Sequence, residues 1–364
     1  MSPKSPPNHN LCPIDRDKGV RTLSNPITFS RRSFMLMPLA LAACKFSSKV
    51  LEIAGFTMGT NYNVVAVDPS NSVDEKLAKA RIEEALALVN RQMSNWDAGS
   101  EISRFNAQTS TESVAVSSDL AHVMQAAEEV HLASEGRFDT TMGPLIELWG
   151  FGAKGTKSMP SEAEIANAAA RAGHGNTLNV GAGALQKTQG EANVYLAAIG
   201  KGFGADKVGQ ALEKLGITDY MVEIGGDLYA SGKNPDGQPW QIGIEKPAAL
   251  SGGVMDVVGV SGLGLASSGD YRNYFEQDGQ RFSHVIDPVT GRPITHTTAS
   301  ATVLADNAML ADAWATAMLT LGRERGLEVA AKHNVAVLFI ERDAAATGLQ
   351  FKSVASPRFA ALTA

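Results

Sequence analysis

The sequence predicts an α+β fold in which antiparallel sheets pack against helices within a single domain. From about residue 217 the chain consists of short β-branched and aromatic runs separated by glycine turns, such as DYMVEIGGDLYASG, WQIGIEKP and SATVLA. Strands spaced this closely favour antiparallel pairing, because parallel strands need a long crossover between them. The 364 residues are 44% hydrophobic, which suffices for one substantial core. We find no internal repeat or long linker and expect one domain with two interleaved lobes.

The rest of the chain is expected to supply helices and a few further strands. Apolar residues recur at a period of 3.6, and the predicted helices cover residues 74–93, 118–134, 160–172 and 307–321. The third of these opens with a capping box of Ser161 and Glu164 and ends at Gly173. Residues 51–67 are rich in β-branched side chains around GFTMGTNY, which predicts two strand segments about a glycine-marked kink. The polar stretch SNWDAGSEISRFNAQTS is expected to be a loop, and VAVLFIER a strand near the C-terminus.

The N-terminal residues predict an export signal. In SRRSFMLMPLALAAC, two arginines precede a short apolar run that is too short to span a bilayer and is interrupted by Pro38. An amphipathic terminal helix is the alternative. The end of this run fits a lipoprotein processing box that lipidates Cys44, and ordinary cleavage after Ala43 is the alternative. We expect residues 1–44 to be a twin-arginine-type lipoprotein signal peptide and residues 45–364 to be the mature domain, anchored on the periplasmic side of the cell envelope.

The charge and cysteine counts argue against a nucleic-acid-binding protein and against a disulfide-stabilised one. The first 44 residues carry six Lys/Arg and two Asp/Glu, a balance of +4, whereas the remaining 320 carry 26 and 36, a balance of −10. An acidic body argues against nucleic acid as a partner. Of the two cysteines, Cys12 lies in the predicted signal, so the mature chain forms no internal disulfide and depends on its core for stability.

Two residues of the predicted C-terminal helix could bind a cation. Asp312 and Thr316 are four residues apart in NAMLADAWATAMLTLGRERG and therefore share one face of the helix. A carboxylate and a hydroxyl suit a hard, oxygen-preferring cation such as Mg²⁺. The alternative is a surface aspartate and a threonine that bonds back to the helix backbone.

Two motifs at strand ends could contact a ligand. In RFSHVIDPVTGRPI, His284 and Asp287 flank two apolar residues before a turn. This histidine suits a general base or a phosphate ligand, and a hydrogen-bonded structural histidine is the alternative. In LASSGDYRNYF, Ser267, Ser268 and Gly269 precede a second aromatic strand. They form either a plain turn or a backbone contact with a ligand.

The stretch NVYLAAIGKGFGAD combines three alternate glycines with the start of a helix. Glycines allow close approach of the backbone to a ligand, and a helix N-terminus favours an anion. However, G-x-G-x-G is not the dinucleotide fingerprint G-x-G-x-x-G, and no acidic residue follows about twenty positions later after a clear βαβ unit. We therefore exclude a Rossmann site.

Taken together and in order, nine stretches resemble the ApbE-type FAD:protein FMN transferase family. They are TMGTNYNV, MSNWDAGSEISRFN, GRFDTTMGPLIELWGFG, AAIGKGFGAD, VEIGGDLYASG, WQIGIEKP, SSGDYRNYF, SHVIDPVTGRPI and ADAWATAMLTLG. These matches cover nearly all of residues 55–322. The resemblance implies an ApbE/T-fold-like domain. It also implies an enzyme that binds FAD and Mg²⁺, transfers FMN to a Thr or Ser hydroxyl of an exported acceptor protein, and releases AMP.

The resemblance also implies which residues form the site. The implied FAD contacts are Met58, Trp96, Arg137, Phe138, Asp139, Tyr195, Lys201 and the backbone near Ile286. The implied metal ligands are Asp312, Thr316 and the backbone oxygens of Ala198 and Ala315, and His284 is implied as the base that takes the proton of the acceptor hydroxyl. This assignment is chemically coherent, because diphosphate cleavage needs positive charge at the phosphate oxygens and a base for the nucleophile. An aromatic ring such as Trp96 can stack on a flat ring system.

One residue departs from the family pattern. The family usually has an acidic residue in the D-L-G-G-I-A-K-G segment where this chain has Tyr195. A carboxylate would accept hydrogen bonds from the nucleotide, whereas a tyrosine donates or accepts one, or stacks, without charge. Two other functions stay open at this level, namely an FAD pyrophosphatase that gives FMN and AMP to water, and a flavin-binding lipoprotein without chemistry.

Overall fold

In the computed structural model, the described residues are 48–152, 158–248, 253–343 and 349–364, and residues 46–364 form one compact unit. The predicted signal peptide over residues 1–44 lies outside the described residues. None of the described helices is long and apolar enough to cross a membrane.

A large antiparallel sheet organises this unit. Its eight described strands run in the order β1-β2-β6-β7-β10-β15-β16-β17, and every neighbouring pair is antiparallel. The strands are β1 Lys49–Thr57, β2 Thr60–Asp68, β6 Asp219–Ile224, β7 Asp227–Ser231, β10 Leu263–Gly269, β15 Thr298–Ala305, β16 Ala336–Arg342 and β17 Phe351–Ala355. The structure thus confirms the α+β class and the antiparallel pairing predicted from the glycine-punctuated β runs.

Smaller antiparallel sheets surround the large one. They are β3-β5-β4, β8-β9, β11-β12 and β13-β14. The strands are β3 Val114–Ala115, β4 Leu178–Val180, β5 Ala184–Lys187, β8 Trp240–Glu245, β9 Val254–Val260, β11 Tyr274–Gln277, β12 Gln280–Ser283, β13 Ile286–Asp287 and β14 Arg292–Pro293.

The helices agree in part with the sequence prediction. They are α1 Glu75–Met93, α2 Glu101–Ala107, α3 Ser118–Ala133, α4 Gly143–Leu148, α5 Glu162–Ala169, α6 His174–Thr177, α7 Gly200–Glu213, α8 Ala308–His333 and α9 Pro357–Thr363. The predicted loop SNWDAGSEISRFNAQTS contains α2, because the Ser100 side chain caps its N-terminus. Helix α8 continues twelve residues beyond the predicted end at 321, with a break at Gly322, whose φ is 71°.

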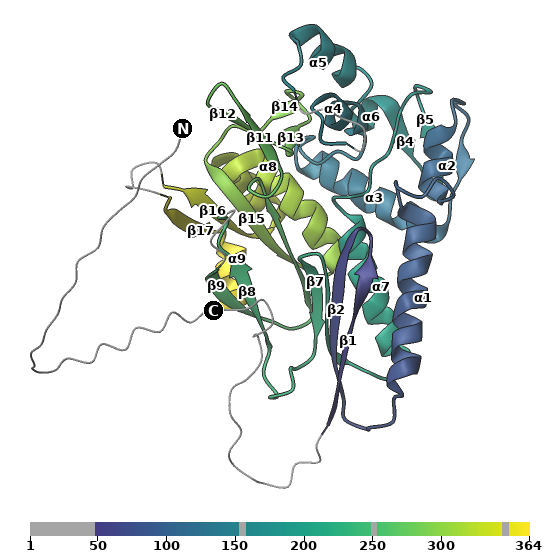
Figure 1. Ribbon diagram of the computed structural model, residues 1–364, viewed down its shortest axis with the longest axis vertical. Helices are drawn as coiled ribbons and strands as arrows, with labels where there is room; N and C mark the ends of the chain where they lie inside the picture. The colour runs from purple at the N-terminus through teal and green to yellow at the C-terminus, as the bar shows by residue number, and fades with distance from the viewer. Residues whose placement is uncertain (1–47, 153–157, 249–252, 344–348) are drawn as a thin grey trace, which may run out of the picture. The chain divides into compact units, whose positions relative to one another are not determined.

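The large sheet is covered on both faces (Figure 1). Alternate residues of β2 point to opposite sides, so that Val64 packs with α1 and α7 while Val67 packs with β8 and α9. Helix α8 covers the same sheet further along, over β10, β15 and β16. The remaining helices α2 to α6 gather beyond the end of these elements, around a core that includes Phe105, Phe138 and Leu196.

The predicted kink in the first strands is a hairpin turn. Met58 and Gly59 have φ values of 50° and 76° and join β1 to β2, with Thr57 paired to Thr60. Two consecutive residues with positive φ form the type of turn that matches the twist of paired strands. The side chain of Met58 is thereby placed against α7, where it lies next to Gly204.

The glycine run of α7 serves helix packing rather than a loop. Gly200, Gly202 and Gly204 all lie within the first helical turns. A Cβ added to Gly202 would lie 2.1 Å from the carbonyl oxygen of Ala308, at the start of α8. The side chain of Asp206 then accepts hydrogen bonds from the N–H groups of Ala308 and Met309 at 2.8 and 2.9 Å. These contacts fix the start of α8 against α7.

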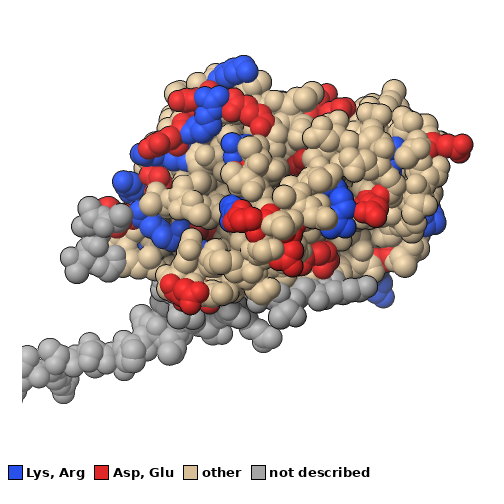
Figure 2. Space-filling model, turned by 90° about the horizontal axis from the view of Figure 1, so that it is seen from above, with Lys and Arg blue, Asp and Glu red and all other residues tan. Residues whose placement is uncertain are grey.

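Charged side chains of both signs are mixed on one face of the molecule. Figure 2 shows Lys/Arg and Asp/Glu interspersed over the face seen from above, without a single-sign tract.

The packing of α7 on α8 predicts a selective effect of glycine substitution. Gly202→Ala forces the helices apart and should lower the free energy of unfolding by about 2 kcal/mol, as overpacking of a core does. Gly200→Ala is the matched control, because its added Cβ meets only Leu196 at 4.0 Å. Thermal and urea unfolding would measure both variants. Equal stability of the two variants would contradict this account of the contact.

Candidate active site

The site is organised by Asp312, which lies on the buried face of α8 with 3% of its surface exposed. Its Oδ2 accepts a hydrogen bond from the backbone N–H of Gly202 at 3.1 Å. In a helix that began before Gly200, the Gly202 N–H would donate to the carbonyl of Ala198, four residues earlier. Because this N–H donates to Asp312 instead, it leaves the Ala198 carbonyl available to another partner. Burial raises the pKa of Asp312, while Lys201 and the Gly202 N–H oppose this rise.

Lys201 lies between Asp312 and a third charged residue, Asp227. Its ammonium donates a hydrogen bond to Asp227 and lies 3.8 Å from Oδ2 of Asp312. Burial alone would lower the pKa of Lys201, but the attraction of Asp312 and Asp227 outweighs burial and raises it. Burial, followed by repulsion from Asp312, raises the pKa of Asp227 to about 7, although Lys201 opposes the shift.

Asp227 was not among the predicted site residues, although it lies within the motif VEIGGDLYASG. Asp227 begins β7 directly after a two-glycine turn and has 3% of its surface exposed. An acidic residue at the end of a tight turn between two apolar strands is ordinarily read as a turn residue. Only the pairing of β6 with β7 and the packing of α7 bring this carboxylate to Lys201.

Two of the other predicted metal ligands lie in α8 with Asp312, and the third lies before α7. Thr316 follows Asp312 by one helical turn, and its Oγ1 is 3.1 Å from Oγ of Ser268 on β10. Ala315 directly precedes Thr316 and is fully buried, and Ala198 lies two residues before the start of α7. Among the described residues no group of three His, Cys, Asp or Glu side chains forms a metal cluster. The predicted ligands offer carboxylate, hydroxyl and backbone oxygens, donors of the kind that Mg²⁺ prefers.

The predicted FAD contacts near α7 and α1 differ in exposure. Met58 is partly buried, and its Cε would lie 2.8 Å from a Cβ on Gly204, one helical turn beyond Lys201. Trp96, after the end of α1, has 78% of its surface exposed. An aromatic ring this exposed is open to stacking with a ligand.

The segment 137–139 is held by ion pairs and hydrogen bonds within the protein. Arg137 forms an ion pair with Asp287, which follows the buried Ile286 in β13. Phe138 is 1% exposed and belongs to the core. The carboxylate of Asp139 accepts hydrogen bonds from the backbone N–H groups of Thr141 and His174 at 2.6 and 2.8 Å, and from the Thr141 hydroxyl. Asp139 therefore shapes this loop with its side chain.

His284 is oriented by a backbone carbonyl. Its Nδ1 lies 3.0 Å from the oxygen of Asn273, and its own N–H donates to the same oxygen at 3.0 Å. Because a carbonyl only accepts, Nδ1 carries the proton of the neutral ring, and Nε2 is the nitrogen that takes up a further proton. The ring contacts Phe151, with centroids 6.3 Å apart.

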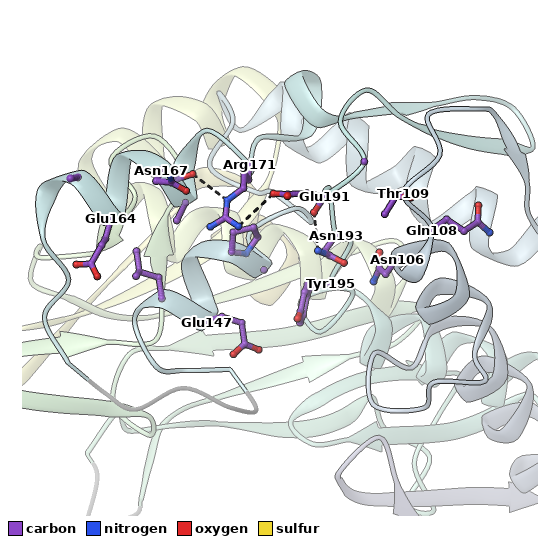
Figure 3. Close-up of a pocket in the computed structure, with 16 residues that line it drawn as sticks. Asn106, Gln108, Thr109, Glu147, Glu164, Asn167, Arg171, Glu191, Asn193 and Tyr195 are labelled. Carbon is purple, nitrogen blue, oxygen red and sulfur yellow. Dashed lines mark hydrogen bonds and ion pairs between the residues drawn. The ribbon is translucent and has the colours of Figure 1, made fainter.

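Tyr195 lines a pocket of about 780 Å³ (Figure 3), and none of Lys201, Asp227 and Asp312 is among the residues that line it. Its ring packs against Gly143 at the start of α4, where an added Cβ would lie 2.3 Å from the ring. Burial, together with nearby Glu147, raises the pKa of Tyr195. None of the other predicted FAD contacts lines this pocket. The lining residues are Asn106, Gln108, Thr109, Gly143, Pro144, Glu147, Leu148, Ala163, Glu164, Asn167, Ala168, Arg171, Gly190, Glu191, Asn193 and Tyr195.

Side-chain amides fix the backbone on both sides of Tyr195. Asn95 donates to the carbonyl of Val194 and accepts from the N–H of Leu196, at 2.7 and 3.0 Å. Asn106 donates to the same carbonyl and accepts from the N–H of Val194, both at 2.8 Å. Tyr195 itself donates its N–H to Thr140 at 2.7 Å. This segment continues directly into α7, so the position of Lys201 depends on it.

A buried lysine ties together two loops of the pocket wall. Lys187, which is 1% exposed, donates to the carbonyls of Asn106, Gln108 and Gly190 at 2.9, 2.6 and 3.3 Å. Figure 3 shows Asn106, Gln108 and Thr109 on one side of the pocket, opposite the Glu164, Asn167 and Arg171 side chains of the α5 region. Three carbonyl oxygens solvate the buried ammonium in place of water.

Comparison with known proteins now assigns the family. The sequence profile of the ApbE family matches residues 58–339, which is most of the chain. The chain belongs to the ApbE family. This match confirms the resemblance predicted from the sequence motifs, and it spans the Asp312 cluster, Tyr195 and His284.

Individual members of the ApbE family agree in length and fold. A Haemophilus influenzae protein named FAD:protein FMN transferase is 43% identical over 313 residues, covering 84% of this chain and 90% of that protein. A protein of the same name from Escherichia coli strain K12 is 34% identical, and the match covers 92% of this chain and 97% of that protein. The solved flavin transferase ApbE from Vibrio cholerae has a TM-score of 0.79 and 39% identity, covering 86% of this chain and 99% of that one. An apo flavinyl transferase ApbE from Pseudomonas stutzeri has a TM-score of 0.79 and 33% identity, covering 88% and 99%.

The buried His174, which packs against half-buried His131 beside Asp139, predicts a pH effect on stability. His174 packs edge-on against His131, and its Nε2 is buried without a hydrogen-bond partner among the described residues. Burial lowers the pKa of His174 to about 4, although Asp139 opposes this. Because the folded-state pKa lies below that of an unfolded histidine, about 6.5, neutral His174 stabilises the fold at higher pH. This stability is lost as pH falls from about 6.5 toward 4.

We therefore expect the free energy of unfolding to fall over this range, with a contribution from His174 of about 3 kcal/mol. In His174→Gln the fall should be shallower by this amount, whereas in His333→Gln, which replaces an exposed histidine, it should match the parent protein. Urea unfolding at a series of pH values would measure it. Identical slopes in all three proteins would refute the assignment.

Proposed function

We propose that this protein transfers FMN from FAD to a Thr or Ser hydroxyl of an exported acceptor protein, with Mg²⁺, and releases AMP. The observation that carries the proposal is the cluster of half-buried Lys201 with the buried carboxylates of Asp227 and Asp312 at the junction of α7 and α8. Relatives that cover nearly the whole chain are named for this transfer, which supports the same reaction here.

The proposed metal site is held by Asp312, Thr316 and the backbone oxygens of Ala198 and Ala315. When bound there, Mg²⁺ would neutralise charge on the diphosphate oxygens. The Lys201 ammonium adds a second positive charge at the same diphosphate, and Ser268 orients the Thr316 hydroxyl through their 3.1 Å contact.

The proposed base is Nε2 of His284, because its Nδ1 proton is committed to the Asn273 carbonyl. His284 takes the proton of the acceptor hydroxyl as the oxygen attacks the phosphorus of the FMN half. A P–O bond forms to the acceptor, and the P–O bond to AMP breaks, so that AMP leaves with the bridging oxygen.

Both side chains and backbone segments make the proposed FAD contacts. Trp96 stacks on a flat ring of the ligand, and Met58, Arg137 and the backbone near Ile286 contact it elsewhere. The side chains of Phe138 and Asp139 are engaged within the protein, so their contribution comes from the backbone of that loop. Tyr195 contacts the nucleotide from the adjoining pocket.

The proposed cellular location follows from the sequence alone. The twin arginines and the LAAC box support export by the twin-arginine route and lipidation of Cys44, on the periplasmic side of the envelope. Acceptor proteins exported to the same compartment would meet the enzyme there.

The transfer can be tested with purified protein, FAD, Mg²⁺ and a candidate acceptor protein. We expect flavin fluorescence on the acceptor band after denaturing electrophoresis, with one AMP released for each flavin attached. AMP release without labelling would instead indicate an FAD pyrophosphatase, and bound FAD with neither product would indicate a flavin-binding protein.

Asp312→Ala should reduce transfer at least about 100-fold, because it removes both a proposed metal ligand and the acceptor of the Gly202 N–H. Asp68→Asn is the matched control, since Asp68 is a buried aspartate that only orders the turn after β2. Initial rates of acceptor labelling would measure both. Undiminished labelling by Asp312→Ala would remove Asp312 from the site.

Tyr195→Asp should weaken FAD binding about tenfold, because it removes the ring that packs on Gly143 and places a carboxylate near Glu147. Tyr195→Phe keeps the ring and should bind FAD as the parent does. Titration of FAD fluorescence would measure both. Tighter binding by Tyr195→Asp would show that the pocket needs the acidic residue usual in the family.

A further inference from the structure

The position of Asp227 is fixed by a turn that few other residues could form. Ile224 pairs with Asp227 across a two-residue turn made of Gly225 and Gly226, whose φ values are 58° and 102°. A Cβ on Gly225 would also lie 2.8 Å from the side chain of Thr60. The turn therefore delivers the Asp227 carboxylate to one place, where it meets Lys201.

Lys201 is bound unequally by its two carboxylates. Its ammonium is hydrogen-bonded to Asp227, whereas its 3.8 Å separation from Oδ2 of Asp312 is longer than a hydrogen bond. Asp312 keeps the Gly202 N–H as its direct hydrogen-bond donor. Asp227 thus draws the ammonium away from Asp312.

The neighbouring carboxylates do not compete for Lys201. Asp206 accepts from the N–H groups of Ala308 and Met309, and Glu223 accepts from Asn63 and the Gly226 N–H. The cluster therefore contains two carboxylates and one ammonium, so that its fully ionised form carries an excess negative charge. Such an excess is costly in a buried site unless a further cation is bound.

We propose that Asp227 is a positioning residue that holds Lys201 off Asp312 and so keeps Asp312 open to a divalent cation. This inference rests on the metal site of the proposed function. Without the charge of Asp227, the Lys201 ammonium pairs fully with Asp312 and competes with the cation. Asp227 acts through Lys201 and contacts no reacting atom.

The test measures binding of Mn²⁺ alone to the full chain, by the loss of the free Mn²⁺ signal in electron paramagnetic resonance, without FAD or acceptor. We expect Asp227→Asn to bind Mn²⁺ about tenfold more weakly than the parent and Lys201→Met to bind it more tightly. In the double variant the Asp227→Asn substitution should lose most of its effect, because the competing ammonium is absent. Asp68→Asn serves as the buried-aspartate control and should match the parent.

Each outcome decides a separate claim. Failure of the parent chain to bind Mn²⁺ would overturn the proposed metal site and this inference together, whereas binding by the parent with no change in Asp227→Asn would overturn only the inference. A full effect of Asp227→Asn in the Lys201→Met background would mean that Asp227 acts directly on the cation and not through Lys201. If Asp227→Asn does not fold, Lys201→Met by itself tests the inference. Unchanged or weaker Mn²⁺ binding by Lys201→Met would contradict the claim that the Lys201 ammonium competes with the cation for Asp312.

Discussion

The contact between the first turn of α7 and the buried face of α8 is the constraint on which the site depends. Gly202 allows the two backbones to approach so closely that its N–H reaches Asp312 at 3.1 Å. Asp206, one turn later, caps the start of α8. Because both helices also pack on the large sheet, the carboxylate, the ammonium of Lys201 and the hydroxyl of Thr316 are held on rigid elements.

The charges of the site are costly to bury, and this cost indicates a functional rather than a structural role. Lys201 is pulled between Asp227 and Asp312, and the burial that raises the pKa of both carboxylates is only partly offset by its ammonium. A structural role would be served better by apolar side chains of similar size. The cluster is instead suited to a ligand that brings both positive charge and phosphate oxygens, which is what a metal-bound diphosphate does.

The sequence predicted the elements with strong local patterns. Helix α1, the capping box of α5 and the strands after residue 217 follow from periodicity, caps and glycine turns. Helix α2 was not predicted although Ser100 caps it locally, and the predicted end of the C-terminal helix at 321 coincides with the break in α8 at Gly322. The packing role of the α7 glycines depends on tertiary contacts. The sequence motifs pointed to Asp312, Lys201 and His284, whereas Asp227 is brought to the site only by the pairing of β6 with β7. The sequence showed that Tyr195 departs from the family pattern, but it did not show the pocket that Tyr195 lines.

The central claim is that the junction of α7 and α8 binds a divalent cation beside the diphosphate. A crystal structure with FAD and Mn²⁺, with anomalous diffraction to locate the manganese, tests it most directly. The account predicts one anomalous peak within coordination distance of an Asp312 carboxylate oxygen and Thr316 Oγ1, with the Lys201 ammonium directed at the diphosphate. A peak elsewhere, or FAD bound away from Lys201, would contradict it.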